Sequence, residues 1–233
     1  MVSNQRGPHD NLIKAVKKHQ SNSFAKPVAE HSHLAFEKAQ SWLKARAGAP
    51  LIFDSCCGVG QSSRIIAERY PDHSVIAVDK SEHRLQRATA HNIPNLLLLR
   101  ADLNDFYRLA QQSQWRLTKH FILYPNPWPK SAHLGRRWHA APVFPYMLAL
   151  AGELEIRSNW KLYIDEFQLA LGCYGIASTS GLLQADEPLT PFEAKYTDSG
   201  QSLWQLTANV PTVHCAALAL CQRWSGASQS SSS

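Results

Sequence analysis

The sequence lacks any run of about 18 consecutive apolar residues, the minimum for a helix that crosses a membrane. Its first residues, MVSNQRGPHDNLIKAVKK, also lack the apolar segment of a secretory signal peptide. Hydrophobic residues nevertheless make up 44% of the 233 positions, enough for one substantial core. We therefore expect a soluble, cytoplasmic protein with one main domain and no membrane partner.

Cysteines are few and poorly placed for cross-links. The five cysteines stand at positions 56, 57, 173, 215 and 221, and none forms a Cys-x-x-Cys pair. An odd number without such spacing predicts neither a disulfide framework nor a zinc site. We expect no bound metal, and we expect Cys56 and Cys57 to pack as small apolar side chains.

Acidic residues are absent from residues 115–140, which contain five lysines and arginines. Residues 1–50 contain eight basic residues against three acids, so each segment carries a net charge of +5, while the whole chain carries +6. Two such segments suit a polyanion such as RNA, because each neutralised phosphate releases counterions. A basic face that meets only solvent is the alternative, and the motifs described below favour RNA.

The two ends of the chain are polar. Residues 1–32 form a basic segment in which residues 1–26 predict a flexible arm that orders on a partner. Residues 33–46 place apolar side chains near one face of an amphipathic helix. We expect one domain over residues 33–224 and a disordered Ser-rich tail over residues 225–233.

Short apolar runs alternate with helical patterns through the middle of the chain. Strands are expected at 51–54, 74–79, 96–100 and 120–124, and helices between them at 61–70 and 81–92. This alternation predicts an α/β fold with a doubly wound, mostly parallel sheet. Further elements are expected as a helix at 142–150, a strand at 154–158, a helix at 161–172, and strands at 176–185 and 200–209. The last two strands have no helix between them, which predicts an antiparallel end to the sheet.

A glycine-containing loop follows the first expected strand. Residues 54–60 read Asp-Ser-Cys-Cys-Gly-Val-Gly, in which Gly58 and Gly60 permit a sharp turn and close approach to a ligand. This spacing alone also occurs in nicotinamide, flavin and nucleotide folds, or in a tight structural turn. The carboxylate of Asp54 favours a cationic ligand, such as a sulfonium methyl donor, over a pyrophosphate.

Two more acids end the next strands. Asp79 ends the second strand, where its two oxygens can accept from both hydroxyls of an adenosine ribose. Asp102 follows the third strand, where a carboxylate can accept from the adenine amino group. Each acid alone would more often cap a helix or face solvent. Acids at three successive strand ends predict a cofactor site at that edge of the sheet.

A proline-rich loop gives the strongest local signal. Residues 124–130 read Tyr-Pro-Asn-Pro-Trp-Pro-Lys, and three prolines in this space impose a rigid, extended loop. Such a loop presents Asn126 and Trp128 with little entropy left to lose. His133, Arg136 and Arg137 follow and are expected to reach RNA phosphates from a helix start.

These motifs, in this order, resemble those of the tRNA guanine-N7-methyltransferases. Residues 124–130 are similar to that family's Phe-Pro-Asp-Pro-Trp-Pro-Lys, and 54–60 to its Glu-x-Gly-x-Gly-x-Gly cofactor loop. Residues 158–163 resemble its Thr-Asp-x-x-x-Tyr element, and 190–193 its Thr-x-x-Glu. The resemblance implies a Rossmann-like class I methyltransferase fold, S-adenosylmethionine as cofactor, tRNA as partner, and a monomer or homodimer that methylates a guanine in the tRNA variable loop.

The resemblance also implies roles for individual residues. It places the cofactor against the loop glycines and against Asp54, Asp79, Asp102 and Asn126. It places the substrate guanine against Lys130, Asn159, Thr190 and Glu193. Asn126 and Glu193 are the expected catalytic residues.

The chain departs from the family pattern at several of these positions. Asn126 and Asn159 stand where the family has aspartates, Cys56 replaces the first loop glycine, and the basic run is thinned. Guanine N7 has no proton to remove, so orientation and exclusion of water suffice and the amides do not forbid activity. An amide both donates and accepts, however, so the base edge that is read can change.

Three other functions remain open on the sequence alone. Asn-Pro-x-Pro resembles the Asn-Pro-Pro-aromatic element of amino-group methyltransferases, which would mean another RNA base or a small molecule as acceptor. A non-catalytic homologue that binds cofactor or RNA is the second. A nicotinamide oxidoreductase is the third and is disfavoured by Asp54 and by the lack of a third glycine at Ser63.

Overall fold

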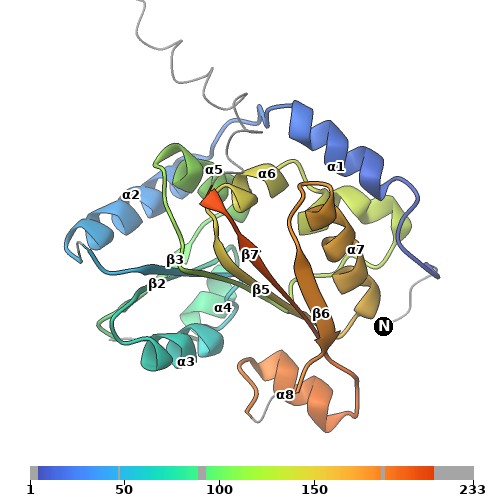
Figure 1. Cartoon of the computed structure of the whole chain (residues 1–233). Helices are drawn as coiled ribbons and strands as arrows, with labels where there is room; N and C mark the ends of the chain where they lie inside the picture. Colours follow the sequence, from blue (N-terminus) through green and yellow to red (C-terminus); the bar gives the residue numbers. More distant parts are fainter. Residues whose placement is uncertain (1–4, 47, 89–92, 185–186, 213–233) are drawn as a thin grey trace, which may run out of the picture.

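The computed structural model describes residues 5–46, 48–88, 93–184 and 187–212. Its centre is a seven-stranded sheet with the order β3-β2-β1-β4-β5-β7-β6 (Figure 1). The strands are β1 Leu51–Ser55, β2 Ser74–Asp79, β3 Leu96–Arg100, β4 Lys119–Leu123, β5 Gly152–Ser158, β6 Ser178–Leu182 and β7 Trp204–Val210. Strands β1 to β5 pair in parallel, whereas β7 runs antiparallel between β5 and β6. The predicted doubly wound sheet with an antiparallel end is confirmed.

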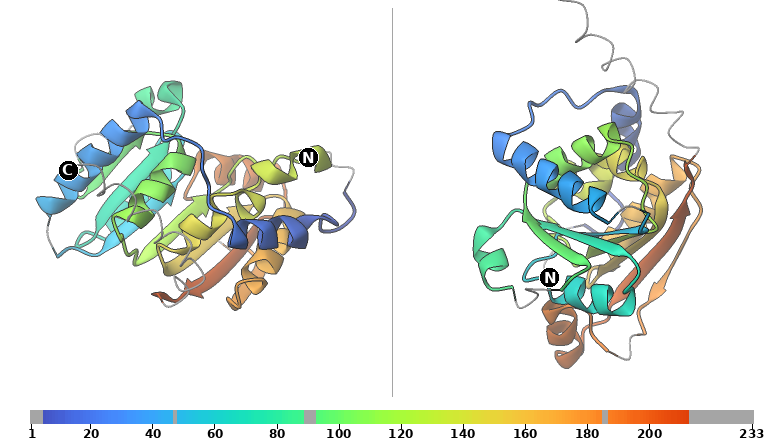
Figure 2. Two further views of the ribbon diagram at one scale, coloured as in Figure 1. Left: turned by 90° about the horizontal axis from the view of Figure 1, so that it is seen from above. Right: turned by 90° about the vertical axis from the view of Figure 1, so that its left-hand side faces the viewer.

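Helices cover both faces of this sheet (Figures 1 and 2). One face carries α1 Leu12–Ser21, α2 Glu30–Lys44, α5 Leu103–Gln112, α6 Phe144–Leu148 and α7 Lys161–Gly172. The opposite side carries α3 Gln61–Arg69 and α4 Glu82–Gln86, while α8 Pro191–Asp198 lies near the end of β6 and the start of β7. Two short 3₁₀ helices, η1 Ser131–Arg136 and η2 Trp138–Ala140, follow the proline-rich loop.

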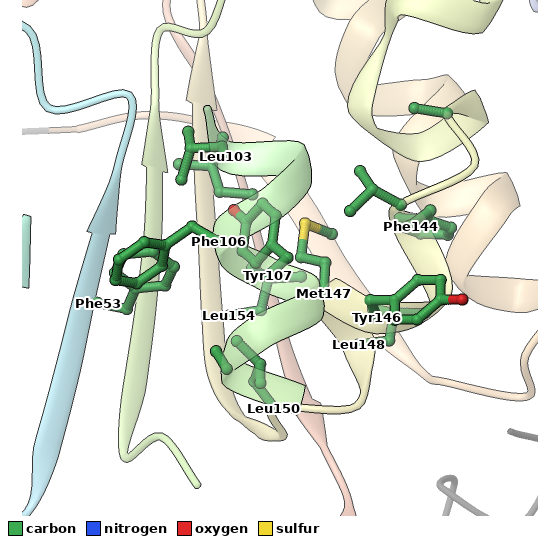
Figure 3. Close-up of a cluster of buried hydrophobic side chains, with 14 of the residues drawn as sticks. Phe53, Leu103, Phe106, Tyr107, Phe144, Tyr146, Met147, Leu148, Leu150 and Leu154 are labelled. Atoms are coloured by element: carbon green, nitrogen blue, oxygen red, sulfur yellow. The ribbon is translucent and has the colours of Figure 1, made fainter. Parts of the chain in front are cut away.

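Alternation along the strands divides the core into two layers. Ile52 and Val75 pack in the smaller apolar cluster on the α3 side, whereas Phe53 and Ile76 pack in the larger cluster on the other face. Successive side chains of a strand point to opposite faces, so a strand covered on both sides is apolar throughout. Phe53 meets the ring of Phe106 from α5 at 5.5 Å, in the cluster drawn in Figure 3.

The N-terminal segment differs from its expectation. Within the described residues of 1–32, α1 forms and buries Leu12 and Val16, each 1% exposed, in the larger core cluster. The polar composition concealed these two positions, which lie four apart and so share one helical face. The flexible-arm prediction is wrong for this part of the segment, and α2 begins at Glu30, across the expected domain boundary.

Most of the other expected elements are confirmed, with small shifts at their ends. Helices α5 and α8 were not predicted from the sequence, and α8 lies between β6 and β7, where the expectation of no intervening helix is wrong. Helix α4 is shorter than the expected helix, whose residues 89–92 lie outside the described chain. The expected tail over 225–233 and the end of the expected domain also fall outside it. Within the described residues, no helix has the length and apolar character needed to span a bilayer.

Candidate active site

A cavity of about 670 Å³ opens at the carboxyl ends of the central parallel strands. Ser55 pairs with Val78 of β2 and with Ile122 of β4, so these strands end at one edge of the sheet. Open α/β sheets bind ligands at this edge. The loops after four strands supply much of the cavity wall, through Cys56, Cys57, Gly58, Val59, Asp79, Lys80, Asp102, Leu103, Tyr124, Pro125, Asn126 and Trp128.

The loop between β1 and α3 turns through three left-handed residues. Cys56, Gly58 and Gly60 have φ values of 64°, 60° and 73°. Glycine tolerates this region freely, whereas Cys56 adopts it at a cost. The Cys56 backbone is held by a 2.9 Å hydrogen bond from its N–H to the carbonyl of Val78. The loop therefore has the sharp turn predicted from the sequence, although a cysteine occupies one of its special positions.

Asp54 lies beneath this loop. Its Oδ2 accepts hydrogen bonds from the hydroxyls of Ser62 and Ser63, each at 2.7 Å, and its Oδ1 has no hydrogen-bond partner among the described residues. Burial raises the pKa of Asp54 to about 6, against the lowering effect of the two serine hydroxyls. Asp54 is not part of the cavity wall. Its contacts tie β1 to the start of α3, and nothing in them tests the predicted contact with the cofactor.

Asp79 and Asp102 both line the cavity. Asp79 accepts from the backbone N–H of Gly58 at 3.0 Å and of Ser81 at 2.7 Å, and it lies 3.3 Å from the guanidinium of Arg84. Asp102 caps α5 by accepting from the Asn104 backbone and amide at 2.9 and 2.8 Å. Each carboxylate oxygen has more than one acceptor site, so both acids keep capacity for a ligand.

These residues fit an adenosine-containing cofactor. The cavity joins two carboxylates, one at the end of β2 and one just after β3, to apolar wall formed by Leu103, Leu123 and Trp138. Hydroxyl and amino groups of a nucleoside need such acceptors, and its base needs apolar surface. Burial, reinforced by the nearby carboxylate of Asp79, raises the pKa of Cys56 to about 12, so this thiol stays neutral and is no nucleophile.

The proline-rich loop forms the cavity wall beyond β4. Tyr124, at its start, and Trp128, two residues before its end, adopt left-handed φ values of 49° and 48°. Asn126 is exposed and lines the cavity, and its Oδ1 accepts from the Trp128 N–H at 3.3 Å. The structure thus presents Asn126 and Trp128 at the cavity on the loop that the sequence predicted.

Arg136 and His133 surround the indole of Trp128. The guanidinium of Arg136 lies 4.7 Å from the indole centroid, and the ring of His133 meets it edge-on at 5.4 Å. Arg136 also lines the cavity, so it stays a candidate for RNA contact. Both residues lie on the 3₁₀ helix η1, in which Arg136 is the last residue and not near the helix start that the sequence predicted. Lys130 is exposed but is not part of the wall.

The predicted RNA contact of Arg137 is wrong. Its side chain is 0% exposed, and its guanidinium donates to Glu166 at 2.5 Å and to Gln5 at 2.6 Å. A phosphate has no access to a guanidinium enclosed in this way. The sequence shows two adjacent arginines, and only the fold distinguishes the outward residue from the inward one.

The expected guanine-facing residues do not all reach the cavity. Thr190 lines it and caps α8 by accepting from the Glu193 N–H at 3.0 Å. Glu193 is 1% exposed, lies behind the wall, and accepts from Arg157 at 2.8 Å. Its burial raises the pKa of Glu193, while Arg157 opposes that shift. Asn159 donates to Gln201 at 3.0 Å and lies outside the wall.

Several wall residues were not predicted from the sequence. They come from three separate segments of the chain and include four cations and two aromatic rings: Phe24, Lys26, Lys80, Arg84, Arg87 and Phe192. Together with Arg136 they leave the wall with more positive than negative side chains. No local sequence pattern predicts these residues, because they come together only in the folded chain.

Solved structures share this fold. A 16S rRNA (adenine(1408)-N(1))-methyltransferase from Catenulisporales acidiphilia matches with a TM-score of 0.55 and 19% identity, over 73% of this chain and 90% of that one. The 16S rRNA methyltransferase KamB matches with a TM-score of 0.55 and 18% identity, over 81% and 99%. At this identity the likeness shows the fold. The fold is therefore that of the class I methyltransferases.

Sequence comparison then gives the family. Residues 48–206 match the family described as "Putative methyltransferase", and the chain belongs to that family. A tRNA (guanine-N(7)-)-methyltransferase of Brevibacillus brevis is 26% identical over 176 residues, which cover 69% of this chain and 80% of that protein. One of the same description from Treponema pallidum is 28% identical over 182 residues, 72% of this chain and 70% of that protein.

Proposed function

We propose that the protein transfers a methyl group from S-adenosylmethionine to N7 of a guanine in the variable loop of tRNA. The observation that carries the proposal is the position of the loop formed by residues 124–130, which walls the cavity beside Gly58 and Asp79. The relatives named above are tRNA (guanine-N(7)-)-methyltransferases and support the same acceptor. We place the activity in the cytoplasm, where such a substrate is found.

Methylation of guanine N7 requires no proton transfer by the protein. S-adenosylmethionine, when bound, supplies an electrophilic methyl group. Guanine N7 offers a lone pair and carries no proton, so the chain needs no general base. Its residues need only hold both partners in line and exclude water, which is how orientation lowers a barrier. Asp79 and Asp102 would hold the cofactor's hydroxyl and amino groups.

The base would enter from the side of Asn126 and Thr190. Both line the cavity, and each offers a group that hydrogen-bonds to a base edge. We assign Glu193 to the support of this side, since it accepts from Arg157 and its backbone N–H donates to Thr190. Lys130 and Asn159 lie outside the wall, so their proposed contacts would be with parts of the RNA beyond the base.

The RNA backbone would meet the basic wall. Lys26, Arg84, Arg87 and Arg136 line the cavity, and exposed lysines extend the positive charge along α1. Each phosphate that meets such a cation releases counterions, which gives affinity that falls with salt.

The test is direct. The protein is incubated with labelled S-adenosylmethionine and bulk tRNA from a strain that lacks its own N7-methylguanosine, and the digested nucleosides are analysed by mass spectrometry. We expect N7-methylguanosine, and no incorporation into tRNA that already carries it. An N-methylated amino group instead would indicate the other acceptor class, which the amide of Asn126 also suits. Cofactor and RNA binding without turnover would indicate a non-catalytic homologue.

A further inference from the structure

The proline-rich loop is held in a costly conformation. Trp128 adopts a φ of 48°, in the left-handed region that bulky residues avoid. Such residues persist only where their surroundings over-determine them. The hydrogen bond from the Trp128 N–H to Asn126, at 3.3 Å, lies within the loop and is exposed. The contacts that stabilise the Trp128 backbone must therefore come from outside the loop.

Arg137, which is buried, provides these contacts. Its Nε and Nη2 both donate to the carbonyl oxygen of Trp128, at 3.2 and 3.1 Å. The guanidinium also lies 5.0 Å from the indole centroid of Trp160, and it is fully buried. Two donors on one carbonyl fix both the position and the direction of the Trp128 peptide group.

Glu166 completes the fixation. Its Oε2 accepts from Arg137 at 2.5 Å and from His139 at 3.0 Å, and its Oε1 accepts from Gln5 at 3.1 Å and from the His9 N–H at 2.9 Å. Burial lowers the pKa of His139, so its neutral ring donates through Nε2. The carboxylate therefore uses all its acceptor sites, and the segment around Gln5 and His9 becomes part of the support.

A buried ion pair of this kind is a poor device for stability alone. Desolvation offsets much of the attraction, and well-packed apolar residues often serve a core as well or better. The pair contributes directional hydrogen bonds, because an apolar side chain cannot donate to a carbonyl oxygen and so cannot orient it. We infer that Arg137, oriented by Glu166 and the Gln5–His9 segment, is a positioning residue that sets the Trp128 carbonyl and thereby places Asn126 at the cavity.

Arginine is required for this role. Its planar guanidinium offers five donors in a fixed fork, and here it makes four hydrogen bonds, to Glu166, Gln5 and the Trp128 carbonyl. A lysine keeps the charge opposite Glu166 but cannot reach the three acceptors in one geometry. Arg137→Lys therefore separates the directional role from the charge.

The inference is tested on the full chain with Arg137→Lys, and with the double variant Arg137→Met/Glu166→Leu, which removes both charges together. Arg46→Lys is the matched control, because Arg46 also donates to a carbonyl, that of Pro94 at 3.2 Å, and lies over an indole, that of Trp42 at 5.2 Å. It does so at the amino edge of the sheet, away from the cavity. Hydrogen exchange of residues 124–130, cofactor affinity, and kcat and KM are measured together with melting temperature.

We expect both Arg137 variants to exchange the loop amides faster and to lose kcat by roughly ten- to a hundredfold, the scale of a small misplacement of reacting groups, with KM for tRNA little changed. Arg46→Lys should change neither. Unchanged exchange and unchanged kcat in the double variant, at an unchanged melting temperature, would overturn the inference. If the double variant unfolds, Gln5→Ala, which keeps the ion pair, decides the matter by the same two readouts.

The kinetic part rests on the proposed function, whereas the exchange part does not. A wild-type protein that fails to methylate tRNA would contradict the proposed acceptor and leave the exchange comparison valid. Faster loop exchange in Arg137→Lys would then still support the positioning role, and equal exchange would refute it.

Discussion

Asp79 Oδ2 accepts a hydrogen bond from the backbone N–H of Gly58 at 3.0 Å, which ties the end of β2 to the loop after β1. The same carboxylate accepts from Ser81 and lies beside Arg84. One residue thus shapes the turn that approaches a cofactor and also faces the cavity that would hold it. The expected ribose contact and the loop geometry therefore depend on the same side chain.

Asp79→Ala should weaken S-adenosylmethionine binding by about 1.5–3 kcal/mol, the cost of losing a charged hydrogen-bond partner. Calorimetric titration measures the affinity. Asp72→Ala, an exposed acid in the turn before β2, is the control and should bind as wild type. Equal affinity of the Asp79 and Asp72 variants would refute the ribose role.

The adjacent arginines should respond differently to salt. Arg136→Ala should reduce the slope of log tRNA affinity against log salt by about 0.7–0.9, the effect of one lost phosphate contact. Arg137→Lys should leave the slope unchanged, because its guanidinium is buried. Filter binding over a range of salt concentrations measures both, with Lys44→Ala at the amino edge as control. A reduced slope in the Arg137 variant would place that residue on the RNA after all.

The sequence predicted the sheet well because buried parallel strands are short and apolar throughout. β2 and β3 have the expected bounds, and α7 is found where expected. Helix α5 was missed, although seven of its ten residues are buried, because the buried set includes Asp105 and Arg108. Their ion pair at 3.7 Å, which lets these charges enter the core, is a tertiary feature that composition does not reveal.

The site was predictable only where one loop carries it. Residues 124–130 and the acids at the strand ends could be found because each motif is local. Gln5 and Arg137 lie 132 positions apart, and no spacing rule relates them. Likewise, Phe24 and Lys26 reach the cavity only because two hydrogen bonds fix the segment after α1. The Phe24 N–H donates to the Tyr146 hydroxyl at 3.0 Å, and Arg108 donates to the Lys26 carbonyl at 2.6 Å.

The buried and the exposed residues of helix α1 should have different effects, on stability and on RNA binding respectively. Leu12→Ala removes a side chain that is 1% exposed and should lower the free energy of unfolding by about 2–5 kcal/mol. Changing the exposed Lys14, Lys17 and Lys18 to alanine should leave that free energy nearly unchanged while weakening tRNA binding. Denaturant unfolding and filter binding measure the two effects. Full stability of Leu12→Ala would mean that α1 does not pack on the domain.

Asp54 should make stability depend on pH in the cofactor-free protein. Its pKa in the folded state, about 6, lies above the ordinary aspartate value of 3.8, so the folded state binds the proton more tightly. This contribution is therefore largest below pH 3.8, is lost as pH rises through 6, and amounts to about 3 kcal/mol for two units. The stability of Asp54→Asn relative to wild type should rise by that amount between pH 3.5 and 7. A difference that does not change with pH would show that folding does not raise the pKa of Asp54.

The two amides that replace family aspartates should behave differently, because the structure separates them. Asn126 lines the cavity, whereas Asn159 lies outside its wall and donates to Gln201 at 3.0 Å. Asn126→Asp offers a charge-assisted acceptor to a base donor or to the cofactor amine. Such a bond is about twice as strong as a neutral one, so a gain of about 1 kcal/mol, several-fold in the rate of guanine N7 methylation, is expected.

Asn159→Asp should give no such gain. It replaces a donor with a second acceptor facing the Gln201 oxygen, and its new charge would meet neither the cofactor nor the base. Single and double variants are compared by initial rates of N7-methylguanosine formation, and the rate of the double variant should not exceed that of Asn126→Asp. Asn126→Asp could instead abolish a native activity on another acceptor and give no gain on guanine. The amide would then serve a different base, because a charge at the cavity without a partner has a desolvation cost and no compensating interaction. A rise in rate from Asn159→Asp alone would mean that this side chain reaches the substrate when tRNA is bound.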